Sequence, residues 1–355
     1  MKNLKNIHLV KILQNQEEIN NMKRDQRLDF LRIVSMILVI IIHVANCYCR
    51  NFSNISNLSY FISVVFNAIS RISVPIFFMI SGSLLANKKY DKKKYLARIK
   101  KFSIILVIWT IIYLLWENLY LGKTNFNFTQ LIFSPERAHL WYLYAIIAIY
   151  IAQPFISAIV NNISKKEKKL FVILWLLFYG VIYSLKTLFN LNIIYQIPII
   201  SGTYYLGYFI IGNFIYQMKD IKEYKKYNNK LIIIFVLSTL ITLLTTYFIS
   251  IKTNRYYDAM FAYRSIFIML SSISIFALAL INDKKNSKII DILPKYSLGI
   301  YLIHGIFLDI IKNIFNIYQI PSIIGIPLYT TIIFILSLLA IKIIKKIPLL
   351  GDYIC

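Results

Sequence analysis

The chain has 355 residues, of which 58% are hydrophobic and only 15% charged, and its formal net charge is +25. A soluble domain is typically about 45–50% apolar and about 25% charged, so this composition excludes an ordinary soluble enzyme, a disordered protein and a disulfide scaffold. The remaining class is a polytopic membrane protein, and the basic excess must be compared with the positive-inside rule before a nucleic-acid partner is considered.

Ten apolar runs of roughly 20 residues follow one another, each long enough to cross a bilayer as a helix. The second is interrupted by Arg71 and Pro75. No segment between the runs is long enough to bury the core of a soluble domain. We therefore predict an all-α polytopic membrane protein with about ten transmembrane helices. The expected spans are 28–49, 60–86, 102–116, 139–160, 170–189, 196–217, 231–250, 260–281, 296–315 and 322–344.

The first span does not have the form of a cleaved signal peptide. It follows a largely polar segment of 27 residues, and it contains Asp29, Arg32 and His43. We expect residues 1–27 to form a cytoplasmic N-terminal segment, and residues 28–355 to form the membrane domain with a short C-terminal tail.

The basic residues predict the orientation of the helices. With the N-terminus inside, 31 of the 40 Lys and Arg residues fall on the inner side and seven on the outer side. This distribution is typical of the positive-inside rule and predicts that both termini are cytoplasmic. The charge excess is then explained by orientation and by contact with anionic lipid, so we expect no nucleic-acid partner.

Ionisable residues inside spans carry the functional information, because a charge at the bilayer centre costs roughly 2.5–3.5 kcal/mol on insertion scales. Arg32 and His43 are 11 residues apart, which brings them to within roughly 20° of the same helix face. Asp29 and Asn46 lie near that face. The polar stripe predicts that this face points into the bundle, with His43 as a candidate general base. A packed histidine and an arginine that reaches the inner interface are the structural alternatives.

The segment "RLDFLRIVSMILVIIIHV", with ten residues between Arg32 and His43, resembles the membrane-bound acyltransferase-3 family, which includes bacterial O-acetyltransferases of surface polysaccharides. The resemblance extends over about 27–310 and is closest to the compact WecH-like type. We expect no extracellular SGNH esterase-like domain. Further segments that match the family in order are "RISVPIFFMISGSLL" (71–85), "YLARIKKFSIILVIW" (95–109), "HLWYLYAIIAIYIAQPFI" (139–156), "YYLGYFIIGNFIY" (204–216) and "SLGIYLIHGIFL" (297–308).

The resemblance implies a cytoplasmic acyl-CoA donor, most simply acetyl-CoA. Segment 87–101 holds eight cations, and the family's basic element matches it at Arg98, with Lys100 or Lys101 in place of a second arginine. Lysine binds phosphate as a point charge without the bidentate fork of arginine. Orientation alone is the alternative explanation of this segment. We add Arg71 to the cofactor-binding candidates, because an arginine inside a span needs a partner or a water-filled cavity.

The same resemblance implies the catalytic roles. His43 would take a proton from an acceptor hydroxyl, Arg32 would hold the donor or stabilise developing charge, and Asp29 would pair with Arg32 or Arg27. No acyl-enzyme intermediate and no metal ion are expected.

Three further residues are candidates for substrate binding: His139 and Trp141 at the outer mouth of the fourth span, and His304 near the middle of the ninth. An aromatic belt at the outer interface is the alternative interpretation of Trp141, and a packed histidine is the alternative for His304.

We therefore expect a multi-pass O-acetyltransferase of the bacterial cytoplasmic membrane. Its partners would be membrane lipids and a polysaccharide of the cell envelope or a lipid-linked precursor of it. A transporter or flippase with a polar core is the competing interpretation, since ten helices with buried charges fit that class on physical grounds as well.

Overall fold

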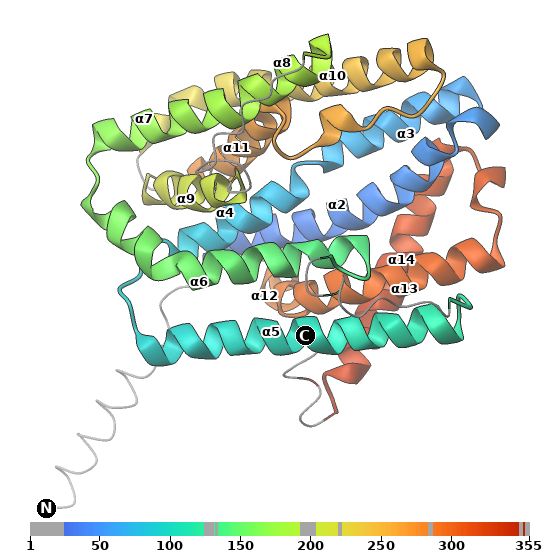
Figure 1. Cartoon of the computed structure of the whole chain (residues 1–355), viewed down its shortest axis with the longest axis horizontal. Helices are drawn as coiled ribbons and strands as arrows, with labels where there is room; N and C mark the ends of the chain where they lie inside the picture. Colours follow the sequence, from blue (N-terminus) through green and yellow to red (C-terminus); the bar gives the residue numbers. More distant parts are fainter. Residues whose placement is uncertain are drawn as a thin grey trace, which may run out of the picture.

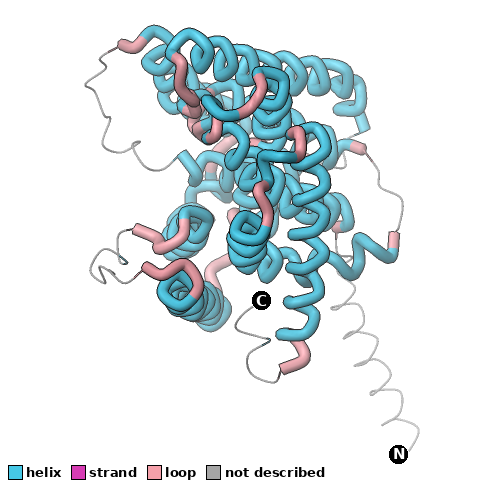
Figure 2. Tube along the Cα trace, turned by 90° about the vertical axis from the view of Figure 1, so that its right-hand side faces the viewer, coloured by secondary structure: helices cyan, strands magenta, loops and turns pink. Residues whose placement is uncertain are grey.

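The computed structural model describes residues 25–123, 131, 134–191, 204–218, 222–282, 287–347 and 351. Within these ranges the chain forms helices joined by turns, and no strand (Figure 2). The main helices are α2 (Gln26–Arg50), α3 (Asn57–Ser70), α4 (Ser73–Leu85), α5 (Lys92–Leu119), α6 (Trp141–Asn162), α7 (Lys165–Trp175), α8 (Ile182–Phe189), α9 (Tyr204–Gln217), α10 (Asn228–Thr253), α11 (Ile266–Ile281), α12 (Lys288–Ile292), α13 (Ser297–Ile314) and α14 (Ser322–Ile344).

Nine helical segments of the described chain are long and apolar enough to cross a membrane. The described part of α9 is 14 residues long and matches the end of the expected span at 196–217, whose first residues lie outside the described ranges. The prediction of an all-α polytopic membrane protein is confirmed. The expected N-terminal segment 1–27 lies outside the described residues except for its last three.

The helices form one bundle in which α2 and α4 occupy the centre. In Figure 1, α7 and α10 run along one edge, α5 runs along the other, and α2 and α4 lie between them. We name the ends of the bundle by their charge. The basic end is where α2 and α5 begin and α4 finishes, and the opposite end is where α2 finishes and α3 begins.

Two local features of the sequence were predicted with different success. The second span is broken as expected, because α3 ends at Ser70 and α4 starts at Ser73, with Pro75 in its first turn. The helix that carries the third span extends beyond the expected span, which starts at residue 102. The helix begins ten residues earlier at Lys92, where Asp91 accepts a hydrogen bond from the backbone N–H of Lys94 and caps the helix.

Glycines allow α4 and α9 to touch through their backbones. A Cβ atom on Gly82 would lie 1.7 Å from the carbonyl oxygen of Phe209, and one on Gly212 would lie 2.2 Å from the carbonyl oxygen of Met79. Ser83 donates a hydrogen bond of 2.9 Å to the Gly212 carbonyl across the same contact. Small residues at such crossings are typical of helix packing in membranes, and here they fix the position of α4.

Candidate active site

Three histidines from distant parts of the chain meet inside the bundle. His43 lies on α2, His139 lies in the short helix η3 (Ala138–Leu140) that leads into α6, and His304 lies on α13. The ring centroid of His304 is 4.9 Å from that of His43 and 4.9 Å from that of His139, which are 6.0 Å apart from each other. His139 and His304 are buried, whereas His43 keeps part of its surface accessible. His43 is therefore the histidine that a substrate can reach.

Backbone groups of α13 hold the two buried histidines. Nδ1 of His304 is 2.5 Å from the carbonyl oxygen of Tyr301, and Nε2 of His139 is 3.2 Å from the carbonyl oxygen of Leu302. Gly305 makes the approach of His139 possible, because a Cβ atom there would lie 3.1 Å from Cε1 of the imidazole ring. The position of His139 thus depends on a glycine of the helix that carries His304.

An ion-pair network at the opposite end fixes the segment that leads into η3. Arg137 pairs with Glu117 of α5 at 2.9 Å and with Asp309 of α13. Lys123 is 2.9 Å from the other oxygen of Glu117, and Trp116 donates a hydrogen bond of 3.1 Å to Asp309. Glu117 is only 1% exposed. The network ties α5, α13 and the residues before η3 together, and so explains why the histidine of η3 turns inward.

Glu136 lies beside this network, in the turn before η3. Burial, together with a hydrogen bond to Glu117 and repulsion from its charge, raises the pKa of Glu136 above its ordinary value. The turn therefore keeps a proton at a pH at which an isolated glutamate would have lost it.

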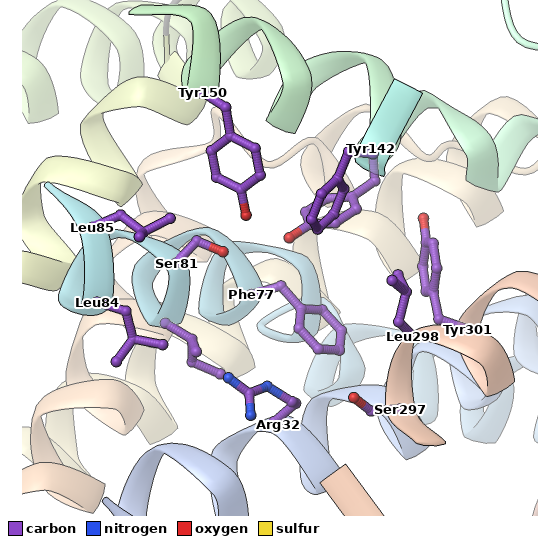
Figure 3. A pocket seen from close by; sticks show the side chains of 12 residues that line it. Arg32, Phe77, Ser81, Leu84, Leu85, Tyr142, Tyr150, Ser297, Leu298 and Tyr301 are labelled. Carbon is purple, nitrogen blue, oxygen red and sulfur yellow. The ribbon is translucent and has the colours of Figure 1, made fainter. Parts of the chain in front are cut away.

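A cavity of about 230 Å³ lies between α2, α4, α6 and α13 (Figure 3). The ring of Tyr301 in its lining is 5.9 Å from that of His139 and 6.0 Å from that of His304, measured between centroids. Arg32 stands at one side of it, and Tyr301, one helical turn before His304, stands at its inner end. The hydroxyl groups of Tyr142 and Tyr150 point from α6 toward the hydroxyl of Ser81 on α4. The cavity is lined by Arg32, Phe77, Ile80, Ser81, Leu84, Leu85, Phe102, Tyr142, Tyr150, Ser297, Leu298 and Tyr301.

The polar stripe of α2 faces the bundle interior, as the helical spacing predicted. Nη1 of Arg32 is 2.7 Å from Oδ1 of Asp29, and the carboxylate is buried. Of the two pairings expected for Asp29, the structure contains the one with Arg32, while Arg27 pairs with Asp25. The carboxylate thus orients the guanidinium at the edge of the cavity.

A second, basic pocket of about 640 Å³ adjoins the cavity at the basic end. Leu85 lines both spaces, and the guanidinium of Arg98 stands over the ring of Tyr150, 5.6 Å from its centroid. Arg98 and Tyr150 therefore join the two spaces. The lining of the basic pocket consists of Leu85, Asn87, Lys88, Lys89, Tyr90, Asp91, Lys94, Tyr95, Arg98 and Gln153.

Lysines other than the predicted ones accompany Arg98. Lys100 and Lys101 are exposed on α5 and are not among the residues that line the basic pocket. Lys94 does line it, because it lies one helical turn before Arg98 on the same face of α5. Four-residue spacing in a helix through segment 87–101 could have identified Lys94 as a neighbour of Arg98. The expected span began only at residue 102, so this spacing was not applied to the segment.

Arg71 lies beyond the histidines as seen from the basic end. It occupies the break between α3 and α4, where Nε donates to the side-chain oxygen of Asn67 at 2.9 Å and Nη2 to that of Asn46 at 3.4 Å. Its guanidinium stands 4.8 Å from the ring centroid of Phe261. Asn46 is almost one turn past His43 toward the opposite end of the bundle. Arg71 therefore lies on the side of the histidines away from the basic pocket.

The aromatic residues at the start of α6 differ in burial. Trp141 is half-buried and packs 4.8 Å from Tyr205 and 5.8 Å from Tyr263, measured between ring centroids. Tyr142 is buried and lines the cavity. His139 lies at the entrance of α6, as expected for the mouth of this span, but its side chain is buried against the other two histidines.

The arrangement provides three chemical environments in sequence from the basic end. A cationic pocket suits phosphate groups. A mostly apolar cavity lined by five hydroxyl-bearing residues suits a thin chain with a few polar groups, and the histidine cluster offers a base. Within the described ranges, no group of three His, Cys, Asp or Glu side chains is arranged to hold a metal ion.

Comparison with known proteins gives one match. The acyltransferase-3 family model, described as an acyltransferase domain, matches residues 25–343. No significant match is found among curated proteins or among solved structures. The matched region contains the three clustered histidines, the cavity and the basic pocket.

Proposed function

Since the chain belongs to the acyltransferase-3 family, we propose that it transfers an acetyl group from acetyl-CoA to a hydroxyl of a cell-surface polysaccharide or of its lipid-linked precursor. Membership of the family supports acyl transfer to a hydroxyl acceptor, and the apolar helices make the protein a multi-pass membrane protein. We place it in the cytoplasmic membrane of a bacterium, with its basic end toward the cytoplasm, where acyl-CoA is available.

The observation that carries this proposal is the continuous order of the basic pocket, the cavity and the histidine cluster. The phosphates of CoA would lie among Arg98, Lys94 and their neighbours, through charge-assisted contacts. The pantetheine arm would follow the cavity, where the hydroxyl groups of Tyr142 and Tyr150 can bond its amides. The thioester would then reach the histidines at the inner end.

His43 acts as the general base in this mechanism. The acceptor hydroxyl gives its proton to His43 while its oxygen forms a bond to the thioester carbonyl carbon. The carbon–sulfur bond breaks, and the CoA thiolate takes the proton from His43. The ester and free CoA are the products, and His43 returns to its starting form.

Arg32 serves the donor rather than the reacting carbonyl. Eleven residues of helix separate it from His43, which is about 16 Å along the axis. A hydrogen bond to the developing oxyanion requires a distance near 3 Å. Its place at the cavity edge, oriented by Asp29, suits contact with the pantetheine or phosphate groups.

The first test follows radiolabelled acetyl-CoA into envelope glycans and lipid-linked precursors, in membranes that carry the native protein or His43→Ala. We expect labelling only with the native protein, because loss of a general base typically costs about 10²–10⁴-fold in rate. Ile41→Val on the same helix is the matched control. Equal labelling by His43→Ala would remove His43 from the mechanism, and no labelling by the intact native protein would refute acetyl transfer and lead to a transport assay.

A second test addresses the donor pocket. Arg98→Ala removes the cation that joins the basic pocket to the cavity, and we expect the KM for acetyl-CoA to rise about tenfold, equivalent to about 1.4 kcal/mol. Lys166→Ala, at an exposed position in the first turn of α7, should leave the KM unchanged. Equal KM values for both variants and the native enzyme would mean that Arg98 serves orientation alone.

A further inference from the structure

One buried ring nitrogen in the histidine cluster makes no hydrogen bond within the described part of the chain. His304 is 1% exposed, and its Nε2 has no hydrogen-bond partner within the part of the chain that the structure describes. A buried polar atom without a partner costs about 1–3 kcal/mol, and native structures contain few of them. Its ring lies 4.9 Å from that of His43, the histidine of the three that is not buried. The location suggests that this nitrogen serves the reaction.

The backbone determines which nitrogen of His304 carries the proton. Nδ1 is 2.5 Å from the carbonyl oxygen of Tyr301, and a carbonyl oxygen only accepts hydrogen bonds. We therefore assign the proton to Nδ1, so that in the neutral ring Nε2 has a free lone pair and can only accept. A ring N–H of His43 is the donor that such a lone pair can use.

His139 is less suited to the same role. Its Nε2 donates to the carbonyl oxygen of Leu302, which leaves Nδ1 as its acceptor atom. That atom lies against Gly305, 3.6 Å from where a Cβ would stand. The ring is also 6.0 Å from His43, farther than the ring of His304.

We infer that His304 is a positioning residue for His43: its Nε2 accepts a hydrogen bond from one ring N–H of His43 and so directs the other, unprotonated nitrogen of His43 toward the acceptor hydroxyl. This inference rests on the proposed function, in which His43 is the base. The inference requires the half-buried His43 side chain to rotate, because no hydrogen bond joins the two rings in the structure. The hydrogen bonds then run from the Tyr301 carbonyl through His304 and His43 to the acceptor hydroxyl.

The step balances without another reactant. When His43 takes the hydroxyl proton it becomes a cation with two N–H groups, and the bond to His304 then becomes charge-assisted and stronger. The proton leaves again with the CoA thiolate, while Nδ1 of His304 keeps its own proton throughout. In serine hydrolases a buried carboxylate orients the base in this way. A neutral imidazole does so without placing a carboxylate in the apolar interior, where an ion is expensive.

Two substitutions of similar size separate the two nitrogens of His304. His304→Gln places an amide oxygen near the position of Nε2, whereas His304→Asn reaches only the position of Nδ1. We expect His304→Asn and His304→Leu to lower kcat by about 10²-fold with little change in the KM for acetyl-CoA. His304→Gln should recover to within about tenfold of the native kcat, because its oxygen can accept from His43. Leu308→Ile on the same helix is the matched control.

The double variant with His43→Ala distinguishes positioning from an independent role. If His304 acts through His43, His304→Leu should cost no further activity when His43 is already alanine. Equal kcat values for His304→Asn and His304→Gln, a native kcat for His304→Leu, or additive losses in the double variant would overturn the inference. Protein levels in the membrane are measured for each variant, and the Asn and Gln pair decides if the Leu variant does not accumulate. Failure of the native protein to label any acceptor would instead refute the proposed function.

Discussion

Replacing Arg137 by methionine tests the ion-pair network that holds the entrance to η3. The substitution keeps an unbranched apolar stem but removes the cation that pairs with Glu117 and Asp309. Glu117 is almost fully buried, so its charge cannot be rehydrated in place. We expect a clear loss of stability and, because the segment also carries His139, a loss of activity.

The magnitude follows from what remains around the two carboxylates. Breaking a buried ion pair by removing one partner typically costs about 3–5 kcal/mol. Lys123 still pairs with Glu117, and Trp116 still donates to Asp309, so we expect the lower limit of about 3 kcal/mol. This corresponds to roughly a 10²-fold change in the ratio of folded to unfolded protein.

The assay is unfolding of the detergent-purified protein, followed by tryptophan fluorescence for the native chain, Arg137→Met, Asp309→Leu and the double variant Arg137→Met/Asp309→Leu. Removing both charges of a pair is less harmful than removing one, so the double variant should recover at least about 1 kcal/mol. Arg255→Met at an exposed position serves as the control and should behave like the native chain.

Two results would refute this reasoning. An unfolding transition of Arg137→Met that coincides with the native one would show that the network does not stabilise the fold. Strictly additive effects of the two substitutions would show that Arg137 and Asp309 do not interact energetically.

Two further predictions concern the same region. Gly305→Ala places a methyl group 3.1 Å from Cε1 of His139, so we expect a lower kcat with an unchanged KM for acetyl-CoA, and native kinetics would exclude a role for this contact. The raised pKa of Glu136 beside Glu117 means that the folded protein binds more protons than the unfolded chain above the ordinary glutamate pKa. Its stability should therefore fall as the pH rises from about 4.5 toward 7. Glu136→Gln should reduce this slope in pH-dependent unfolding, and an unchanged slope would assign it to another group.

The helices and the polar stripe of α2 could be predicted because they depend on local patterns. Apolar length defines a span regardless of its neighbours, and helical spacing alone places Arg32 and His43 on one face. The pairing of Asp29 with Arg32 follows from their three-residue separation in the same way.

The convergence of the histidines could not be predicted in this manner. His43 and His304 come from nearly opposite ends of the chain, and only the packing of α13 against α2 brings them together. The meeting of His139 with the other two histidines was not predictable either, because the sequence does not show that Arg137 reaches carboxylates on two other helices. Long-range ion pairs and close helix crossings are properties of the assembled bundle.

The backbone contact between α4 and α9 at Gly82 and Gly212 has a consequence for how a bulky donor enters. In the α3–α4 segment, 61% of the apolar stretch is buried inside the protein, compared with 28% of the apolar stretch of α5. The wall of the cavity formed by α4 is thus anchored to α9. The wall formed by α5, which carries Arg98 and Phe102, mostly faces lipid. Lipid chains can replace the contacts of α5 at little cost when the helix moves. Opening should therefore consist of the basic end of α5 moving outward, because Glu117 and Trp116 hold its other end. A covalent crosslink between α5 and α6 at the basic end would then trap the substrate path closed, and one between α4 and α9 would leave turnover intact.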